Sequence, residues 1–191
     1  PSDLGANVSS TSINNAQVVF DRFANRWLVL GEGSETQGNW LYLAISKTAN
    51  PNDGFRAVRF VGDSTGIRHN GELNIGVDED ALLICSRNLV NVPGFPANQK
   101  ISNSIYTVPR ADLYTVSPTL TNMSRFENLS LTTHGDYIRP ASSIEQSDNK
   151  ATFLSSGANA ITGASTGENY IINVSNVKQF GATMATPVKI D

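Results

Sequence analysis

The chain has 191 residues, of which 39% are hydrophobic and only 16% are charged, and its formal net charge is -3 at pH 7. This charge excludes nucleic acid as an expected partner, because binding to phosphates relies on clustered lysine and arginine side chains. No apolar segment approaches the roughly 18 residues that a membrane-spanning helix needs, so membrane insertion is not expected either.

Asparagine, serine, threonine and glycine are abundant, a composition typical of β-rich proteins that work outside the cell. We therefore expect an extracellular or cell-surface location. The first ten residues, PSDLGANVSS, have neither the charged nor the apolar region of a signal peptide, and the start at Pro1 favours a processed or partial product. The single Cys85 excludes an internal disulfide, and its position in the apolar run ALLICS predicts a buried structural thiol.

In chain order, the first predicted element is a β-hairpin in which QVVF and RWLVL flank the turn DRFAN. The apolar strand NWLYLAIS follows, then the turn formers PNDG and a further strand, FRAVRFVG. A second hairpin joins LNIGV to ALLIC through DED, and the strand NSIYTVPRADL comes after it. A third hairpin joins ASSIE to ATFLS through QSDNK and is followed by ENYIINVSNV. Helical periodicity is nearly absent, so the predicted fold class is all-β.

The three hairpins share one plan, in which an apolar residue and then an acid precede the turn, at Phe20–Asp21, Val77–Asp78 and Ile144–Glu145. They recur about every 60 residues, and antiparallel units with such a period are typical of β-propeller blades. Strands such as WLVL and LYLAI are apolar on both faces, which is expected where neighbouring sheets cover both sides of a blade.

We therefore expect three repeats of about four strands each, at approximately residues 15–64, 65–133 and 134–191. Each repeat would have an inner strand, two central strands and a weaker outer strand. Closed propellers have about four to eight blades. The chain is therefore expected to be part of a larger propeller, completed by further blades of the same chain or of a partner chain. The alternative is a β-sandwich, in which the period is accidental.

The segments VVFDRFANRWLVL and LYLAISKTANPNDGF resemble a hairpin and strand of uncharacterised secreted bacterial β-propeller proteins, which are related in architecture to sialidases. The matching residues are Val19, Phe20, Asp21, Arg26, Trp27, Leu43, Ala44, Ile45, Ser46, Thr48, Pro51, Gly54 and Phe55. ELNIGVDEDALLIC looks like the next blade, and YIRPASSIEQSDNKATFLS like the one after it. The chain departs from the group at Ala16-Gln17, where the group has Asp-Pro. The resemblance implies a propeller fold and no particular chemistry, since the group has no agreed activity.

Two motifs, HNGEL and HGDY, each place a histidine, a glycine and an acid just before an expected inner strand. Such loops would converge at one end of a propeller, where ligand contacts are commonly found. Their groups could hold a sugar hydroxyl or a cation, or exchange a proton near neutral pH. The alternative is that glycine and the acids only form the turns. The candidate ligand-binding residues are His69, Glu72, His134, Asp136 and Arg139.

No catalytic residues are predicted. A sialidase needs three arginines around a carboxylate and a tyrosine nucleophile, and YIRP at Tyr137–Pro140 has the wrong residue order for the arginine motif of that family. Two histidines and one cysteine form no recognisable zinc motif. Asp78 and Asp80 are weak candidates for calcium ligands, and the alternative for them is a solvated hairpin turn.

The leading functional hypothesis is a non-catalytic propeller segment of a secreted or surface-exposed protein, which binds a glycan or a protein. One alternative is a glycosidase-like propeller enzyme, in which further blades supply the missing acids and arginines. A second alternative is a structural component of a virion or an extracellular filament, in which neighbouring chains cover the open sheet edge.

Overall fold

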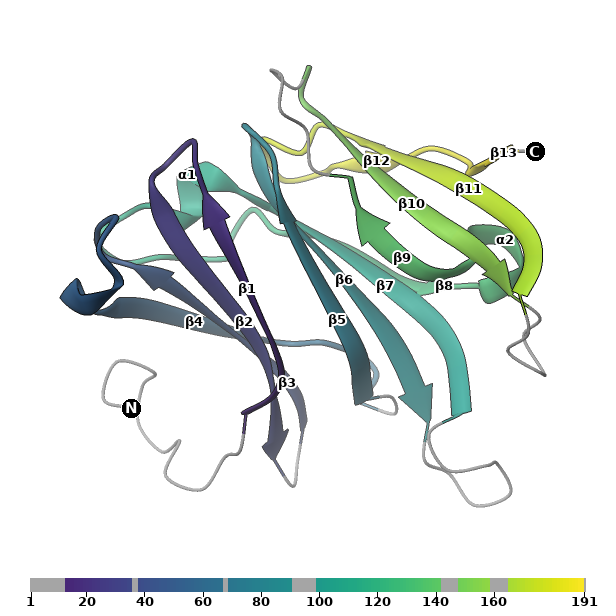
Figure 1. Cartoon of the computed structure of the whole chain (residues 1–191), viewed down its shortest axis with the longest axis horizontal. Helices are drawn as coiled ribbons and strands as arrows, with labels where there is room; N and C mark the ends of the chain where they lie inside the picture. The colour runs from purple at the N-terminus through teal and green to yellow at the C-terminus, as the bar shows by residue number, and fades with distance from the viewer. Residues whose placement is uncertain are drawn as a thin grey trace.

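Antiparallel β-sheets dominate the fold (Figure 1). The computed structural model describes residues 13–35, 38–66, 69–90, 99–141, 148–158 and 165–190. Within these ranges the strands form three sheets, and each sheet comes from one continuous stretch of the chain. The all-β prediction is therefore confirmed. In this described part of the chain, neither short helix has the length and apolar character needed to cross a bilayer.

The first sheet contains, side by side in chain order, β1 (Ile13–Asp21), β2 (Arg26–Glu35), β3 (Gly38–Ser46) and β4 (Phe55–Val61). Between β3 and β4, Pro51–Asp53 form a short 3-10 turn. The Asn50 side chain accepts a hydrogen bond from the Asn52 N–H (3.1 Å), and Gly54 ends the turn with a φ of +90°. The apolar strand β3 thus stops because proline and asparagine open the turn and glycine supplies its positive φ.

The second sheet has the same order, with a short helix α1 (Arg110–Leu113) after its third strand. Its strands are β5 (His69–Val77), β6 (Ala81–Val90), β7 (Gln99–Pro109) and β8 (Ser124–Leu129). The helix α2 (Leu131–His134) then leads into the third sheet. The third sheet comprises β9 (Asp136–Pro140), β10 (Lys150–Ala158), β11 (Ser165–Ser175) and β12 (Thr183–Met184), and β13 (Val188–Ile190) also pairs with β11.

The third sheet begins at Asp136, in the HGDY motif, close to where the sequence analysis expects an inner strand. Its first strand β9 precedes the segment ASSIE, and residues 142–147, which include Ile144 and Glu145, lie outside the described residues. β9 pairs with β10, for example at Arg139 opposite Leu154. The predicted strand ATFLS falls within β10, as expected.

The second sheet is covered on both faces. On one face Leu82 and Ile84 of β6 pack against Leu28 and Leu43 of the first sheet. On the other face Leu83 belongs to a second core, which also contains Cys85, Ile105, Phe153, Ile172 and Val174. β6 is therefore covered by sheets on both faces, whereas WLVL and LYLAI, for which this explanation was offered, lie in β2 and β3 of the first sheet, where a described sheet covers one face only. Cys85 is buried as predicted, and this burial raises the pKa of its thiol.

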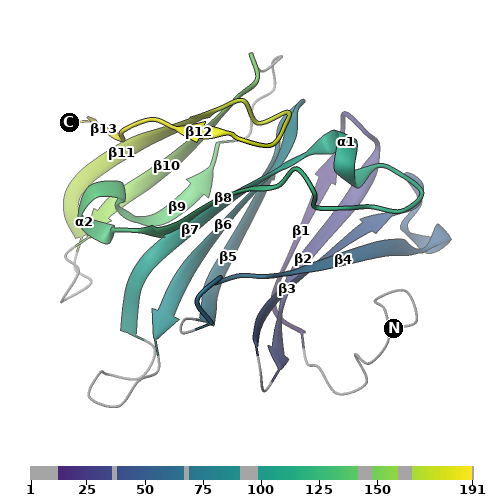
Figure 2. The same ribbon diagram turned by 180° about the vertical axis from the view of Figure 1, so that it is seen from behind.

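The first strands of the three sheets are neighbours, since β1 contacts β5 and β5 contacts β9. β1 and β5 lie toward the viewer in Figure 1, whereas β4 and β8, the fourth strands of their sheets, lie toward the viewer in Figure 2. Sheets one and two are therefore stacked in the same sense, with their first strands on the same side of the molecule.

The outward faces of the first and third sheets are not covered by any sheet of the described residues, and we call them the open faces. On the first sheet Val18 and Phe20 are 59% and 38% exposed, although Val19 between them packs into the core. On the third sheet Leu154 is 48% exposed, whereas its neighbour Phe153 is fully buried. Side chains alternate between the two faces of a strand, so these exposed residues mark the faces that no described sheet covers.

Two of the three acid-containing hairpins use their aspartate in the same way. Asp21 Oδ1 accepts hydrogen bonds from the N–H groups of Phe23 (2.8 Å) and Ala24 (3.1 Å). Asp78 Oδ1 accepts them from Asp80 (2.8 Å) and Ala81 (2.7 Å), again two and three residues along the chain. Both aspartates are buried. The shared plan therefore reflects a buried carboxylate that closes the turn, and its third member, Glu145, lies outside the described residues.

Replacing Asp78 with alanine is expected to lower the free energy of unfolding by about 1–3 kcal/mol, because two N–H groups lose their acceptor. Asp78→Asn keeps an acceptor at Oδ1 and should cost less. Burial raises the pKa of Asp78, and the two backbone hydrogen bonds oppose this shift. Because the folded-state pKa of Asp78 is raised, the stability contributed by protonated Asp78 is present at low pH and is lost as pH rises through that pKa. Asp78→Asn has no titrating group at this position, so its free energy of unfolding lacks this pH dependence. Urea unfolding measures the free energy of unfolding of both variants. An equal loss in Asp78→Ala and Asp78→Asn would refute the role of Oδ1 as the acceptor.

Candidate functional site

Two of the predicted ligand-binding carboxylates meet at an arginine that the sequence analysis did not single out. Arg87, near the end of β6, is only 5% exposed. Its Nη1 lies 3.1 Å from Glu72 Oε2 of β5. Its Nε and Nη2 lie 2.9 and 2.8 Å from Oδ1 of Asp136, the first residue of β9. Arg87 therefore joins the first strands of the second and third sheets.

A lysine and a tyrosine complete this group. Lys100 Nζ of β7 lies 3.3 Å from Asp136 Oδ2. The ring centroid of Tyr137 lies 3.6 Å from Arg87 Cζ and 5.0 Å from Lys100 Nζ, which places two cations near one aromatic ring. Tyr137 has a φ of +53°, uncommon for a large side chain, and this backbone turn lets two successive residues both contact Arg87. We call the following five residues the Arg87 cluster: Glu72, Arg87, Lys100, Asp136 and Tyr137.

The chain enters β9 through Gly135, whose φ is +77°. Its carbonyl accepts a hydrogen bond from Asn103 Nδ2 (2.9 Å). A Cβ atom at this position would lie 2.5 Å from Ser155 Oγ and 2.7 Å from the Ser156 carbonyl oxygen. Both the left-handed backbone and the close approach of β10 therefore require glycine directly before Asp136.

Gly135→Ala is expected to destabilise the protein by about 1–3 kcal/mol, through backbone strain and contact with the β10 backbone. Gly167→Ala is the matched control, because Gly167 also has a positive φ, of +76°, but has open space around its Cβ position within the described structure. The control should show only the strain of the positive φ. Thermal unfolding of both variants separates the two effects, and equal shifts in Tm would contradict the role of the close approach.

The structure describes the side chain of His134 but not that of His69, so the predicted grouping of His69 with Glu72 lies outside the described residues. His69 begins β5, where its backbone lies opposite Leu89. His134 ends α2, where its ring Nδ1 lies 2.8 Å from Thr133 Oγ1 and its carbonyl accepts a hydrogen bond from Ser155 Oγ. Burial lowers the pKa of His134, so the neutral imidazole is favoured. His134 therefore helps to fix α2 against β10.

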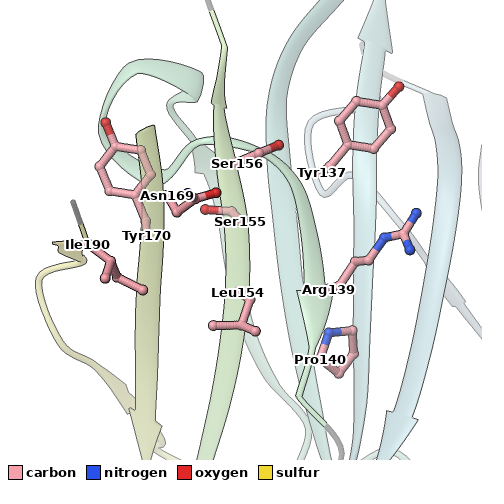
Figure 3. A pocket seen from close by; sticks show the side chains of 9 residues that line it. All are labelled: Tyr137, Arg139, Pro140, Leu154, Ser155, Ser156, Asn169, Tyr170 and Ile190. Atoms are coloured by element: carbon pink, nitrogen blue, oxygen red, sulfur yellow. The ribbon is translucent and has the colours of Figure 1, made fainter. Parts of the chain in front are cut away.

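Arg139 lies apart from these residues, in a pocket on the open face of the third sheet (Figure 3). The pocket has a volume of about 730 Å³ and is lined by Tyr137, Arg139, Pro140, Leu154, Ser155, Ser156, Asn169, Tyr170 and Ile190. Figure 3 shows Tyr137 and Arg139 on one side of β10, with Tyr170 and Ile190 on the other. Among the described residues the Arg139 side chain has no hydrogen-bond or ion-pair partner.

The calcium candidates have structural partners instead. Asp78 is bonded to the turn N–H groups, and Asp80 accepts a hydrogen bond from the Asn149 N–H (3.1 Å) and pairs with Lys178 Nζ at 3.0 Å. Calcium needs several converging oxygen ligands, whereas these carboxylates face N–H groups and a cation. Across the described ranges, no group of three or more His, Cys, Asp or Glu side chains is placed to hold a metal ion. The alternative of a solvated turn is also wrong, because Asp78 and Asp80 are buried.

The Arg87 cluster combines a buried ion pair with an accessible rim, although Arg87 Nη2, 2.8 Å from Asp136 Oδ1, makes no hydrogen bond with the described residues. Asp136, 1% exposed, is surrounded by Arg87, Lys100 and its own neighbour's N–H, so its oxygens are already engaged. Glu72, Tyr137 and Lys100 are 55%, 41% and 31% exposed. The arrangement therefore offers a carboxylate, an aromatic ring and an ammonium group to a ligand.

Comparison of the chain with known protein families, with characterised proteins and with solved structures found no match.

Proposed function

We propose that the chain is a non-catalytic segment of a β-propeller, part of a secreted or surface-exposed protein, and that it binds a glycan at the Arg87 cluster. The observation that carries this proposal is the stacking of three consecutive antiparallel sheets whose first strands β1, β5 and β9 are neighbours. Such an order of strands is what a propeller has around its central axis.

The position of the cluster supports a binding role. Glu72, Lys100 and Asp136 lie near the starts of β5, β7 and β9, and Arg87 lies near the end of β6. In antiparallel sheets these positions fall at one and the same end, the end at which β4 leads to β5 and β8 leads to β9. Ligands commonly bind to loops held by rigid elements, and this end gathers groups from two sheets.

The chemistry of the rim favours a sugar over a protein segment. The Tyr137 ring combines an apolar face with a polar hydroxyl, and Arg87 supports it from behind. Glu72 and Lys100 add an acceptor and a donor for sugar hydroxyls on either side. The charge of buried Asp136 is balanced by Arg87 and Lys100. A carboxylate held in this way is suited to positioning its neighbours rather than to transferring a proton.

The test is binding of the fluorescently labelled protein to an array of glycans. We expect the protein to bind one class of glycan on the array. The affinity of Tyr137→Ala for that glycan should be about tenfold lower, as expected for loss of an aromatic contact. Glu79→Gln is the control for Glu72→Gln, since Glu79 lies in the β5–β6 hairpin at the opposite end of the sheet. Only the Glu72 variant should weaken binding.

Four results would count against this proposal. Retention of no glycan, or unchanged binding in Tyr137→Ala, would remove the glycan site. Binding of a protein from a panel of secreted proteins, lost in Tyr137→Ala, would favour the protein ligand. Release of free sugar from a retained glycan would favour the glycosidase-like alternative.

A further inference from the structure

We propose that a second copy of this chain covers both open faces of the stack. The third sheet of each copy would pack against the first sheet of the other, so that two copies form one ring of sheets around a two-fold axis. This inference rests on the propeller arrangement proposed above, and it names the partner that completes it.

The open face of the first sheet carries bulky apolar side chains. Val18 is 59% exposed, and the rings of Phe20 and Trp27 contact each other with centroids 4.9 Å apart. Their neighbours on β1 and β2, Val19 and Leu28, point the other way into the core between the first two sheets. This face is therefore an apolar surface that the chain does not bury against its own described sheets.

The open face of the third sheet is hollow where the first is bulky. The 730 Å³ pocket lies on it, with Leu154 and Ile190 exposed by 48% and 40%. The Arg139 side chain in this pocket has no ion-pair or hydrogen-bond partner in the described structure. An aromatic ring from the first sheet of a second copy would give the Arg139 guanidinium a cation–π partner. The chain already contains such a contact, in which Arg59 Cζ lies 4.4 Å from the ring centroid of Trp40.

The chain itself shows how such faces are covered. It buries one face of the second sheet against the first sheet and the other face against the third. Continuing this stacking places another sheet on each open face. A contact between two unlike faces closes into a ring when the rotation allows it. Two copies with three sheets each give six sheets, within the range of about four to eight that propellers use.

The mass of the protein in solution, measured by light scattering during size-exclusion chromatography, tests this pairing. We expect twice the 20.5 kDa mass of one chain, in a form that dissociates on dilution. Val18→Lys and Leu154→Glu each place a charge on one of the two faces, and each should give the mass of a monomer with an unchanged circular dichroism spectrum. Phe180→Lys is the control, because Phe180 is 71% exposed in the β11–β12 connection, and it should stay a dimer.

Mixing the two monomeric variants gives the sharpest result. In a mixed pair one contact is unsubstituted, and the other sets the introduced lysine against the introduced glutamate as opposite charges, so the mixture should recover the dimer mass. A monomeric unsubstituted protein, or a dimer that neither variant affects, would overturn the inference. Tyr137 lines both this pocket and the Arg87 cluster, so the glycan array is also run with Val18→Lys, whose substitution lies on the first sheet. Unchanged glycan binding by that monomeric variant would show that the two proposals fail separately.

Discussion

Arg87→Met is expected to lower the free energy of unfolding by about 3–5 kcal/mol, one of the two largest effects of a single replacement considered for this protein. Asp136 is 1% exposed, and its Oδ1 lies within contact distance of both the Nε and the Nη2 of Arg87. Without the guanidinium, Lys100 would be its one remaining cation in the cluster, and a buried charge that is poorly compensated costs several kcal/mol. Urea unfolding followed by circular dichroism measures the loss.

Glu72→Gln is the matched control for this pair. Glu72 also pairs with Arg87, but it is 55% exposed, so the loss should stay below about 1 kcal/mol. The double variant Arg87→Met, Asp136→Leu removes both buried charges and should recover much of the stability, because an apolar pair replaces a buried ion pair at little cost. If Arg87→Met lowered the free energy of unfolding no more than Glu72→Gln does, the pair of Arg87 and Asp136 would not be a buried ion pair.

Phe153→Ala should destabilise the protein by a similar amount, about 3–5 kcal/mol, because it opens a cavity in the core between the second and third sheets. Phe153 is fully buried there, with Leu83, Ile105 and Ile172 in the same core. The same chemical change at Phe180, which is 71% exposed, should alter stability by less than about 1 kcal/mol. Thermal unfolding of the two variants compares them, and equal Tm shifts would show that the third sheet does not pack on the second as described.

Much of the fold could be predicted because its signals are local. The alternation of short apolar runs and turn residues identifies β1 to β7 and the hairpins closed by Asp21 and Asp78. The apolar run ALLIC predicts a strand with a buried Cys85, and β6 is a strand that buries this thiol. The helices α1 and α2 have four residues each, too few for a helical period to be visible in the sequence.

The Arg87 cluster could be predicted only in part, because its contacts are distant in sequence. The motifs with His69 and His134 located Glu72 and Asp136, but Arg87 and Asp136 are 49 residues apart. One signal was available: Arg87 follows the apolar run ALLIC by two residues, and an arginine that continues a buried strand is normally paired. His134 was predicted as a partner of Asp136 because the two residues share a motif. Sequence spacing did not reveal that His134 completes α2 instead.

The open faces were beyond the reach of the sequence for a different reason. The apolar residues of β1 and β10 look alike whether a neighbouring sheet covers them or not, and only the packing shows that Val18 and Leu154 remain exposed. The pocket around Arg139 depends on β9, β10, β11 and β13, whose pairing brings together residues from 137 to 190. No local pattern encodes that arrangement.

A crystal structure of the protein tests the central claim, the stacking of three sheets in propeller order, most directly. We expect one rotation about a common axis to carry the first sheet onto the second and the second onto the third, with β1, β5 and β9 nearest that axis. A two-layer sandwich, or sheets unrelated by any repeated rotation, would contradict it.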